Sequence, residues 1–276
     1  MKTLLLFGAI ALSINAFSQA PTYVPTNGLV AWYGFNGNAD DETGNGNNGT
    51  NNGATLTTDR FSNVNSAYSF DGNDIISAIS NFDASNRTVS AWFNIDSYSG
   101  TQQIILNNDY PELTNGHTIF AIQGTDSLLF QSGTLVDLLA PPELATWYFV
   151  AITRDVDSTR CYLNGTLVTS YVNDVIVSIT AASQSLRIGV NRFNDRYFNG
   201  KIDDIGIWNR ALNECEITEL YTGIQCDLGI ENNTLNTPKQ LLKIVDLMGR
   251  ETPYKPNTVL IYVFDDGSAK KVFKMD

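Results

Sequence analysis

Histidine is almost missing from this chain of 276 residues, which contains only His117. A single histidine is too little for a zinc site built on several imidazoles, and it gives a Ser-His-Asp triad little to work with. A lone histidine in a strand more often has an ordinary structural role. The scarcity therefore argues against histidine-based metal chemistry and nucleophilic catalysis.

Cysteine is also rare, with three residues in the chain. In an exported protein a disulfide is plausible. Cys215 and Cys226 are close in sequence and flank a short predicted helix, so we expect them to pair. Cys161 alternates with apolar neighbours in a predicted strand, which favours a buried thiol. The expected disulfide is Cys215–Cys226.

Basic residues are few, and they are unevenly distributed. The chain has 17 Lys and Arg against 29 Asp and Glu, a net charge of −12. Residues 19–238 carry nine basic and 24 acidic residues, a net charge of −15, whereas residues 239–276 carry seven and five, a net charge of +2. An acidic body argues against nucleic acid and against anionic membrane surfaces as partners. It suits cation binding, or simply solubility outside the cell.

Long hydrophobic runs are missing except near the N-terminus, where Lys2 precedes an apolar run from Leu4 to Leu12. Ala16-Phe17-Ser18 then fits a small-x-small cleavage site. This pattern predicts a secretory signal peptide over residues 1–18, because the run is too short to span a membrane. No cysteine follows the cleavage site, so a lipid anchor is not expected. We therefore expect a soluble, exported mature protein without a membrane span.

The rest of the chain is a succession of short β-rich runs separated by turn signals, which predicts an all-β fold. Within 88–95, Val89, Ala91, Phe93 and Ile95 share one face of the expected strand. Asn164-Gly165 separates two β-rich runs and indicates a hairpin. The expected strands are 29–35, 67–70, 75–79, 88–95, 103–107, 118–123, 127–131, 147–154, 159–163, 166–171, 185–190 and 200–208.

One short helix is expected over 213–221, with Asn213 as its cap and Glu216 three residues later in a variant capping box. Leu212 and Ile217 fit a hydrophobic staple, and Gly223 ends the helix. We expect this helix to close one edge of the β-sandwich. Residues 227–238 are polar and indicate a linker between a body at 19–226 and a small β unit at 239–276. Strands are expected there over 241–247, 258–264 and 270–275.

The stretch from Gly28 to Thr50 joins an apolar strand to a loop made mostly of Gly, Asn and Asp. Gly and Asn tolerate left-handed backbone conformations, so this loop can fold tightly. Asp40, Asp41 and Glu42 offer hard oxygen ligands of the kind that calcium takes. From the residues alone, the segment is either a calcium loop or a solvated connection rich in turns.

A series of sequence runs occurs in this order across residues 28–222: GLVAWYGFNGNADDETGNGNNGT, DRFSNVNSAYSFDGNDII, RTVSAWFNI, TWYFVAITRD, RCYLNGTLV, LRIGV and FNGKIDDIGIWNRALNECEITELY. The ordered series resembles the laminin-G-like, concanavalin-A-like lectin/glucanase superfamily in its bacterial secreted form. The resemblance implies a jelly-roll of two antiparallel sheets, in agreement with the strand pattern.

This resemblance also implies one structural calcium ion near the rim of the sandwich. Asp41 matches the loop aspartate of the family and Asp203 the aspartate of a late strand, with Asp40 and Asp204 as neighbours. Carboxylates from two distant segments would supply charge to a shell of six to eight oxygens. The alternative is that Asp41 caps a turn and Asp203 accepts backbone N–H bonds.

The superfamily that the chain resembles also contains glycoside hydrolases of the laminarinase type, which carry a Glu-x-Asp-x-x-Glu motif on one strand. No such motif occurs in this chain. Retaining hydrolysis needs two carboxyl groups about 5–5.5 Å apart. Asp203 and Asp204 are adjacent, so in a regular strand they would point to opposite faces. We therefore expect that this protein is not an enzyme.

A non-catalytic module that recognises extracellular carbohydrate is the preferred function, and an adhesion or structural protein that contacts other proteins is the alternative. Jelly-roll modules use aromatic groups to stack on sugars and Asn, Asp and Arg to bind hydroxyls. Trp92 could instead belong to the core, and the 190–196 segment could be a plain solvated loop. The candidate ligand-binding residues are Trp92, Tyr98, Tyr110, Asn191, Arg192, Asn194 and Arg196.

The C-terminal unit contains the runs KIVDLMGRET, NTVLIYVFDDG and KKVF. With these runs it resembles the sorting tails of type IX secretion cargo in Bacteroidetes-type bacteria, although the usual Pro-Asn-Pro strand ahead of them is missing. The resemblance implies recognition by the type IX machinery, and release from the cell or attachment to its surface. The alternative is a small β-appendage packed on the body, since fewer than 40 residues make a poor independent core.

Overall fold

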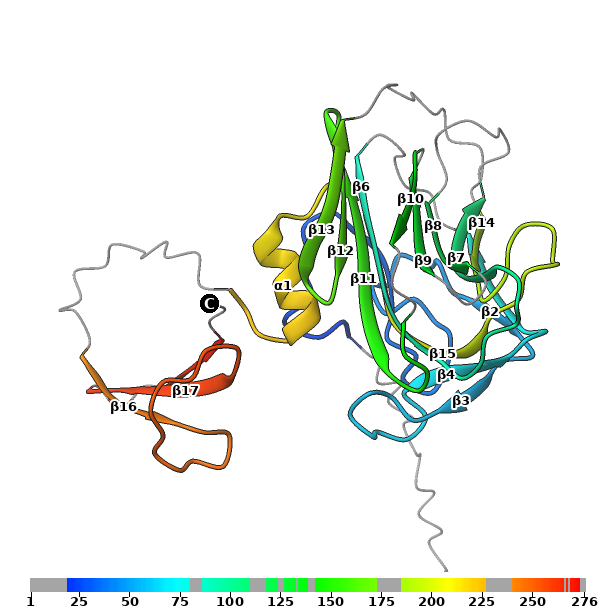
Figure 1. Ribbon diagram of the computed structural model, residues 1–276. Coiled ribbons are helices and arrows are strands. Elements are labelled where there is room, and N and C mark those ends of the chain that lie inside the picture. The colour runs from blue at the N-terminus through cyan, green and yellow to red at the C-terminus, as the bar shows by residue number, and fades with distance from the viewer. Residues whose placement is uncertain are drawn as a thin grey trace, which may run out of the picture.

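The computed structural model describes residues 19–79, 86–109, 118–123, 127–132, 134–138, 142–172, 185–226, 240–265, 267 and 269–273. The predicted signal peptide and linker, together with Tyr110 and His117, lie outside this part of the chain. The described residues form two facing antiparallel sheets and a small C-terminal sheet (Figure 1). The predicted all-β sandwich with a small β unit is therefore confirmed.

The first sheet of the sandwich has eight strands in the order β13-β12-β11-β6-β15-β4-β3, and β1 also pairs with β15. Its central strand pair is β6 and β15, which run antiparallel. The strands are β1 (Leu29–Tyr33), β3 (Thr55–Thr57), β4 (Ala67–Asp71), β6 (Arg87–Ile95), β11 (Trp147–Arg154), β12 (Ser158–Leu163), β13 (Thr166–Val172) and β15 (Asn199–Trp208).

The second sheet has seven strands in the order β10-β9-β8-β7-β14-β5-β2. Neighbours that are distant in sequence, such as β14 and β5, pair here because the chain crosses between the sheets. The strands are β2 (Thr50–Asn52), β5 (Ile75–Ile79), β7 (Gln103–Asp109), β8 (Thr118–Gln123), β9 (Ser127–Ser132), β10 (Thr134–Leu138) and β14 (Ser185–Ile188).

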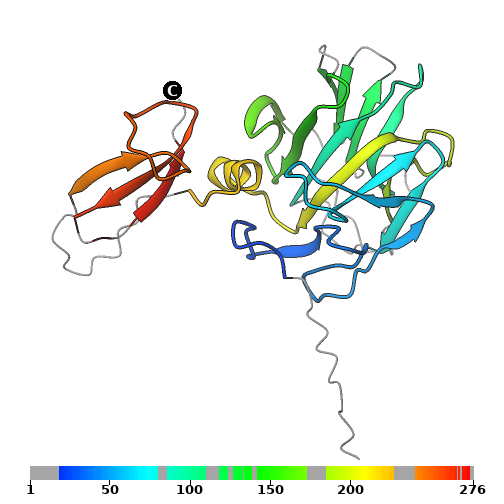
Figure 2. The same ribbon diagram turned by 90° about the horizontal axis from the view of Figure 1, so that it is seen from below.

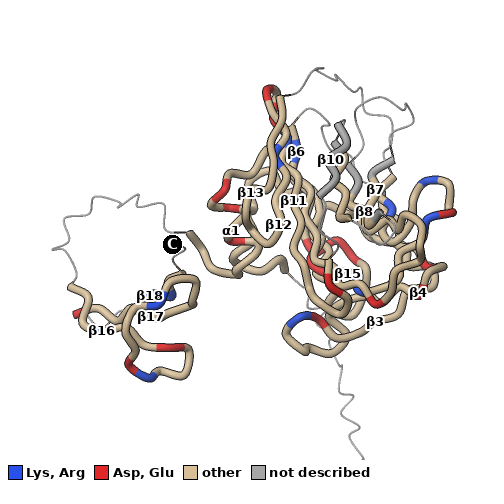
Figure 3. The backbone as a smooth tube through the Cα atoms, viewed as in Figure 1, with Lys and Arg blue, Asp and Glu red and all other residues tan. Residues whose placement is uncertain are grey.

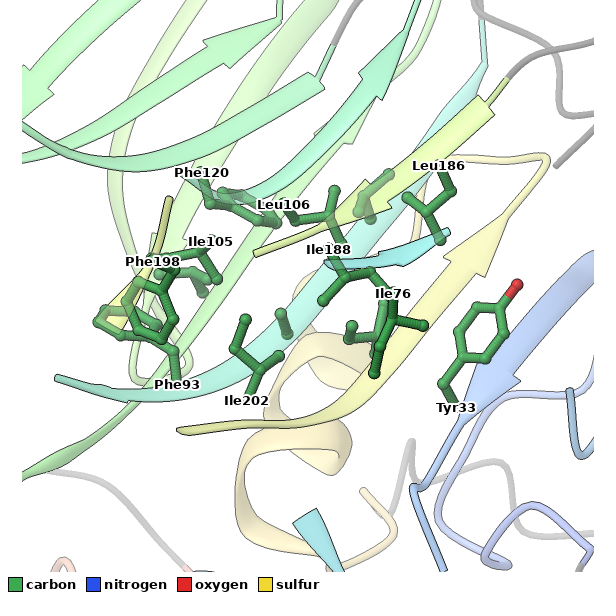
Figure 4. Close-up of a cluster of buried hydrophobic side chains, with 14 of the residues drawn as sticks. Tyr33, Ile76, Phe93, Ile105, Leu106, Phe120, Leu186, Ile188, Phe198 and Ile202 are labelled. Atoms are coloured by element: carbon green, nitrogen blue, oxygen red, sulfur yellow. The ribbon is translucent and has the colours of Figure 1, made fainter. Parts of the chain in front are cut away.

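The main core lies between the two sheets, as Figure 4 shows for a cluster of apolar side chains that point toward one another. Alternation along each strand places every second side chain in this core. In β6 these are Val89, Ala91, Phe93 and Ile95, as the sequence predicted. In β14 they are Leu186 and Ile188, so the intervening Arg187 points to the outer face of the second sheet.

A second apolar cluster lies on the outer face of the first sheet. It joins Trp92, Trp208 and Phe149 of the sheet to Ile217 and Leu220 of helix α1 (Glu214–Thr222). The prediction that this helix closes an edge of the sandwich was wrong, because α1 covers the outer face beside the central strands. Alternation on β6 explains this: both faces of the strand carry large side chains, so both need an apolar cover.

The ends of α1 follow the sequence signals. The Asn213 side chain accepts a hydrogen bond from the Glu216 N–H at 3.0 Å, and the Glu216 carboxylate accepts one from the Asn213 N–H at 2.9 Å, which completes a capping box. Gly223 ends the helix in a left-handed conformation, with φ of 68°. The predicted disulfide between Cys215 and Cys226 is present and joins the first turn of α1 to the chain just beyond it.

Turn chemistry also acts as predicted at Asn164-Gly165. Both residues have positive φ, 49° and 76°, and they connect β12 to β13 through the pair Leu163 and Thr166. Three strands were not predicted: β2, β3 and β10. The first two are only three residues long. Three residues are too few to show an alternation of apolar and polar side chains. The pairing of β2 with β5 and of β3 with β4 therefore decides their structure.

The C-terminal unit is an antiparallel sheet in the order β16-β17-β18, as Figures 1 and 2 show. Its strands are β16 (Leu241–Val245), β17 (Val259–Phe264) and β18 (Ala269–Phe273). Val245 and Leu260 are its buried apolar residues, whereas Leu242, Leu247 and Met248 are exposed. Among the described residues, no helix has the length and apolar character needed to cross a membrane.

Candidate functional site

The predicted calcium loop after β1 is organised by the carboxylate of Asp41, which is buried. Its Oδ1 accepts hydrogen bonds from the backbone N–H of Trp32 at 3.2 Å and of Thr43 at 3.0 Å, and from the Thr43 hydroxyl at 2.7 Å. Its Oδ2 accepts bonds from the backbone N–H and the side-chain amide of Asn47, at 3.1 and 3.2 Å. Asp41 thus closes the loop onto β1, and its neighbour Asp40 is exposed.

Asp203 and Asp204, in the middle of β15, bind the same arginine. The Arg60 Nη1 lies 3.1 Å from Asp203 Oδ2, and its Nη2 lies 2.7 Å from Asp204 Oδ2. The Tyr23 hydroxyl donates to the same Asp204 oxygen at 3.3 Å. The expectation that adjacent aspartates point to opposite faces was wrong, because β15 is irregular there. Its register shifts between Asp203 and Gly206, and Asp204 has φ of 44°.

This cluster is buried and carries one more negative than positive formal charge. Asp203 is 2% and Asp204 9% exposed. Burial, and then repulsion from Asp204, raises the pKa of Asp203 well above its ordinary value, while Arg60 opposes the shift. Burial also raises the pKa of Asp204, and Arg60 again lowers it in part. Desolvation lowers the pKa of Arg60, but its two carboxylate partners outweigh this effect and leave that pKa raised.

Three of the four aspartates predicted as calcium ligands, Asp41, Asp203 and Asp204, have oxygens that already accept hydrogen bonds, so they do not fit a calcium shell in this arrangement. A calcium ion needs six to eight oxygen ligands with open lone pairs. Both oxygens of Asp41 accept from N–H or O–H donors, and Arg60 binds an oxygen of Asp203 and one of Asp204. Asp203 Oδ1 also accepts from the Asp204 N–H at 2.8 Å. Calcium at these residues stays a prediction that chelation can test.

Only one close group of three potential metal ligands occurs in the described part of the chain. It comprises Cys215, Glu219 and Cys226, with ligand atoms within 4.8 Å of one another. Its two sulfur atoms are joined in the disulfide, so they are not thiolate ligands. Glu219 instead accepts a hydrogen bond from the Cys226 N–H at 2.7 Å.

Trp92, a predicted sugar-stacking residue, is only 7% exposed and belongs to the cluster beneath α1. Its ring stacks on Tyr221 with centroids 5.6 Å apart. The Arg60 guanidinium carbon lies 4.4 Å from the centroid of the Trp92 ring and 4.5 Å from that of the exposed Phe61 ring. Trp92 therefore packs against the Arg60 cluster, which agrees with the alternative that it belongs to the core.

The other predicted binding residues gather in the rim loop, residues 189–198 between β14 and β15. Figure 3 shows both basic and acidic positions on this loop. The Arg192 guanidinium lies 4.5 Å from the centroid of the Phe193 ring, which is 67% exposed. Asn194 accepts a hydrogen bond from Arg187 at 2.9 Å. This bond ties the loop to the outer face of the second sheet.

Asn191 builds the rim loop from within. It is buried, and its amide donates to Asp195 Oδ1 at 2.6 Å and accepts from the Asp195 N–H at 3.1 Å. Arg196 donates to the side-chain oxygen of Gln102. Thr101, Gln102, Asp195 and Arg196 line an open hollow of about 310 Å³.

Tyr98 lies in the segment before this hollow but takes no part in it. Its ring packs against the main core, and its hydroxyl donates to the carbonyl of Pro142. The structure therefore brings Asn191, Arg192, Asn194 and Arg196 together and leaves Tyr98 and Trp92 elsewhere.

Sequence reasoning missed Arg60, Phe193 and Gln102. One signal for Arg60 was present: two adjacent aspartates in an apolar strand need a positive partner if they are buried. Gln102 gave no signal, because its place beside Arg196 arises from the meeting of two distant loops.

The two-sheet antiparallel sandwich, with a rim loop at one end, is a jelly-roll module. The description "Concanavalin A-like lectin/glucanases superfamily" matches residues 48–218, and the chain belongs to this family. The predicted laminin-G-like membership of the body is thereby confirmed. No curated protein matches the chain.

Two solved structures illustrate the fold likeness. One is domain 4 of AbnA, a GH43 extracellular arabinanase from Geobacillus stearothermophilus, in complex with arabinotriose. It is 24% identical with a TM-score of 0.56, over 70% of this chain and 98% of that one. Another is Trypanosoma rangeli sialidase in complex with sialic acid, 17% identical with a TM-score of 0.53. That match covers 72% of this chain and 34% of the sialidase. At these identities the likeness shows the fold alone.

Proposed function

We propose that this protein is a non-catalytic module that binds extracellular carbohydrate through its rim loop. The supporting observation is the convergence of Arg192, Phe193 and Arg196 on one exposed loop beside a hollow. An exposed aromatic ring offers a face to sugar C–H groups, and guanidinium N–H groups donate to sugar oxygens. A related fold bound to arabinotriose is consistent with this use of a jelly-roll.

The contacts of three acidic groups support a non-catalytic role. Asp203 and Asp204 are buried and bound by Arg60, so they do not face a substrate. Glu216 is held by Arg210 at 2.5 Å and by its capping contact with Asn213. We expect no release of reducing sugar from any polysaccharide that the protein binds, and measurable turnover would refute this part of the proposal.

The test is a glycan and polysaccharide binding screen of the whole chain, run once with calcium and once with a chelator. Binding to at least one glycan supports the proposal. Failure to bind any glycan by a protein whose thermal unfolding shows that it is folded refutes it. A hit that disappears with the chelator would support the predicted role for calcium, which the engaged carboxylates argue against.

Contact with another protein is the second candidate function, and one observation favours it. Phe61 and Val64 are 68% and 74% exposed on the loop before β4. Asp59 holds this loop through the N–H groups of Phe61 and Asn63, both at 2.8 Å, so the apolar groups sit on an ordered loop. Loss of a protein partner on Phe61→Ser, with glycan binding unchanged, would assign adhesion to this loop.

For the C-terminal unit we propose recognition by type IX secretion machinery, and hence a secreted or cell-surface location in a Bacteroidetes-type bacterium. Exposed Leu242, Leu247 and Met248 on a small sheet suit a segment that is recognised from outside. Deletion of residues 239–276 in such a host is expected to stop export and leave the protein in the periplasm. Unchanged export would overturn this proposal and favour a simple appendage.

A further inference from the structure

The rim loop differs from the rest of the acidic body in how its positive charges are balanced. Elsewhere in the body Arg60, Arg160, Lys201 and Arg210 each have a carboxylate partner within 4.0 Å. Among the described residues, Arg192 and Arg196 form no such ion pair. Of the nine basic residues between positions 19 and 238, three fall within residues 187–196.

Arg192 and Arg196 contact neutral groups. Arg196 donates to the amide oxygen of Gln102, and Arg192 stacks on Phe193. These contacts orient the guanidinium groups without neutralising them. A guanidinium has five N–H donors in a planar fork, so one amide contact leaves donors for a second acceptor.

We propose that the rim loop recognises an acidic sugar unit, one that carries a carboxylate or a sulfate ester. This inference rests on the proposed carbohydrate-binding function and specifies its ligand class. The forked guanidinium matches the paired oxygens of a carboxylate or sulfate, and such charge-assisted hydrogen bonds are stronger than neutral ones. The exposed Phe193 ring would meet the apolar face of the same or the next sugar.

The net charge of the body limits how long this ligand can be. With −15 over residues 19–238, an extended polyanion that leaves the loop would meet a surface of like charge. At physiological salt the screening length is about 8 Å, so the more distant carboxylates of the body repel a group bound at the rim only weakly, and Asp195 is the acidic residue that lines the hollow itself. We therefore expect recognition of one or two acidic units, with binding that weakens as salt rises.

The experiment measures binding of the whole chain to oligogalacturonate and to the same oligosaccharide after reduction of its carboxyl groups. A galactose disaccharide with one sulfate ester and the same disaccharide without it form the second pair, which separates sulfate from carboxylate recognition. Stronger binding to the charged member of either pair is expected. Arg192→Gln and Arg196→Gln are each expected to weaken that binding about tenfold or more, since each removes a charge-assisted hydrogen bond.

Arg160→Gln is the matched control. Arg160 is a half-exposed arginine on β12 of the first sheet, and it pairs with Asp155 at 2.9 Å. Its replacement should leave glycan binding unchanged. Thermal unfolding of each variant verifies the fold. Equal binding of charged and neutral glycans, or equal loss in all three variants, would overturn the acidic ligand while the carbohydrate function stands. Binding to no glycan at all would overturn both.

Discussion

Replacement of Arg60 by methionine should destabilise the sandwich strongly at neutral pH. The substitution keeps an apolar stem against Trp92 but removes the positive charge between Asp203 and Asp204. The side-chain atoms alone are 9% exposed in Arg60, 3% in Asp203 and 12% in Asp204, so solvent screens the charges little. Loss of one partner from a buried ion pair costs about 3–5 kcal/mol. In a domain of this size that is a fall in Tm of roughly 6–20 °C.

The pH dependence of Arg60→Met provides a sharper signature than its magnitude. Burial already raises the folded-state pKa of both aspartates in the native protein. Removal of Arg60 should raise them further, because Arg60 opposes the shift. A raised folded pKa contributes stability that is complete below the unfolded value, about 3.9 for Asp, and is lost as pH rises through the folded pKa. Acidification from pH 7 toward pH 5 should therefore narrow the gap between variant and native protein.

Urea unfolding at pH 5, 6 and 7 checks this reasoning. Lys201→Met on the same strand is the control, since Lys201 pairs with Asp96 at a more exposed site and its loss should cost less than about 1 kcal/mol. The triple variant Arg60→Met, Asp203→Asn, Asp204→Asn should recover part of the lost stability. The buried charge account would be refuted if Arg60→Met lowered the free energy of unfolding no more than Lys201→Met does, and by the same amount at each pH.

Three further outcomes follow from the same structure. Joint replacement of Cys215 and Cys226 by serine should lower the free energy of unfolding by about 2–3 kcal/mol, as the loop-entropy relation gives for this separation, and urea titration measures it. Asp41→Ala should lower Tm, because it leaves backbone N–H groups of the first loop without their acceptor. A chelator should leave the Tm of the native protein unchanged, because the Asp41 oxygens already accept hydrogen bonds; a fall in Tm with the chelator would contradict this account and support the predicted calcium. Burial raises the pKa of the Cys161 thiol to about 12, so a thiol reagent at pH 8 should label it only after unfolding.

Sequence patterns predicted most of the sandwich because its strands are amphipathic or doubly covered. Val89, Ala91, Phe93 and Ile95 alternate with polar or larger residues, and Asn164-Gly165 marks its hairpin without help from the rest of the fold. The predictions were wrong where tertiary contacts decide the local structure. The left-handed backbone at Asp204 and the shift in register beside it bring two neighbouring carboxylates to one arginine. The regular alternation of side chains along a strand, with its period of two residues, does not predict where such a bulge occurs.

The candidate site was predicted in part. Four residues of the rim loop were singled out by their type, and the structure brings them together. Their different roles were not readable, since Asn191 builds the loop while Arg192 and Arg196 face outward. Trp92 illustrates the opposite difficulty. An aromatic residue at a polar position of a strand suggests exposure, but α1 covers that face, and helix packing leaves no local mark on the strand.

The disulfide between Cys215 and Cys226 also determines where a mechanical force on the C-terminal end would enter the folded body. Tension applied beyond Cys226 passes through the sulfur atoms to the first turn of α1, so the turn at Gly223 cannot unravel first. The loaded point is then a helix start held by the capping box and by Arg210. Behind it, Ile217 and Leu220 rest in the tryptophan cluster on the first sheet. If the body were held through its C-terminal end, the force would therefore act at the start of α1, which the capping box and Arg210 hold.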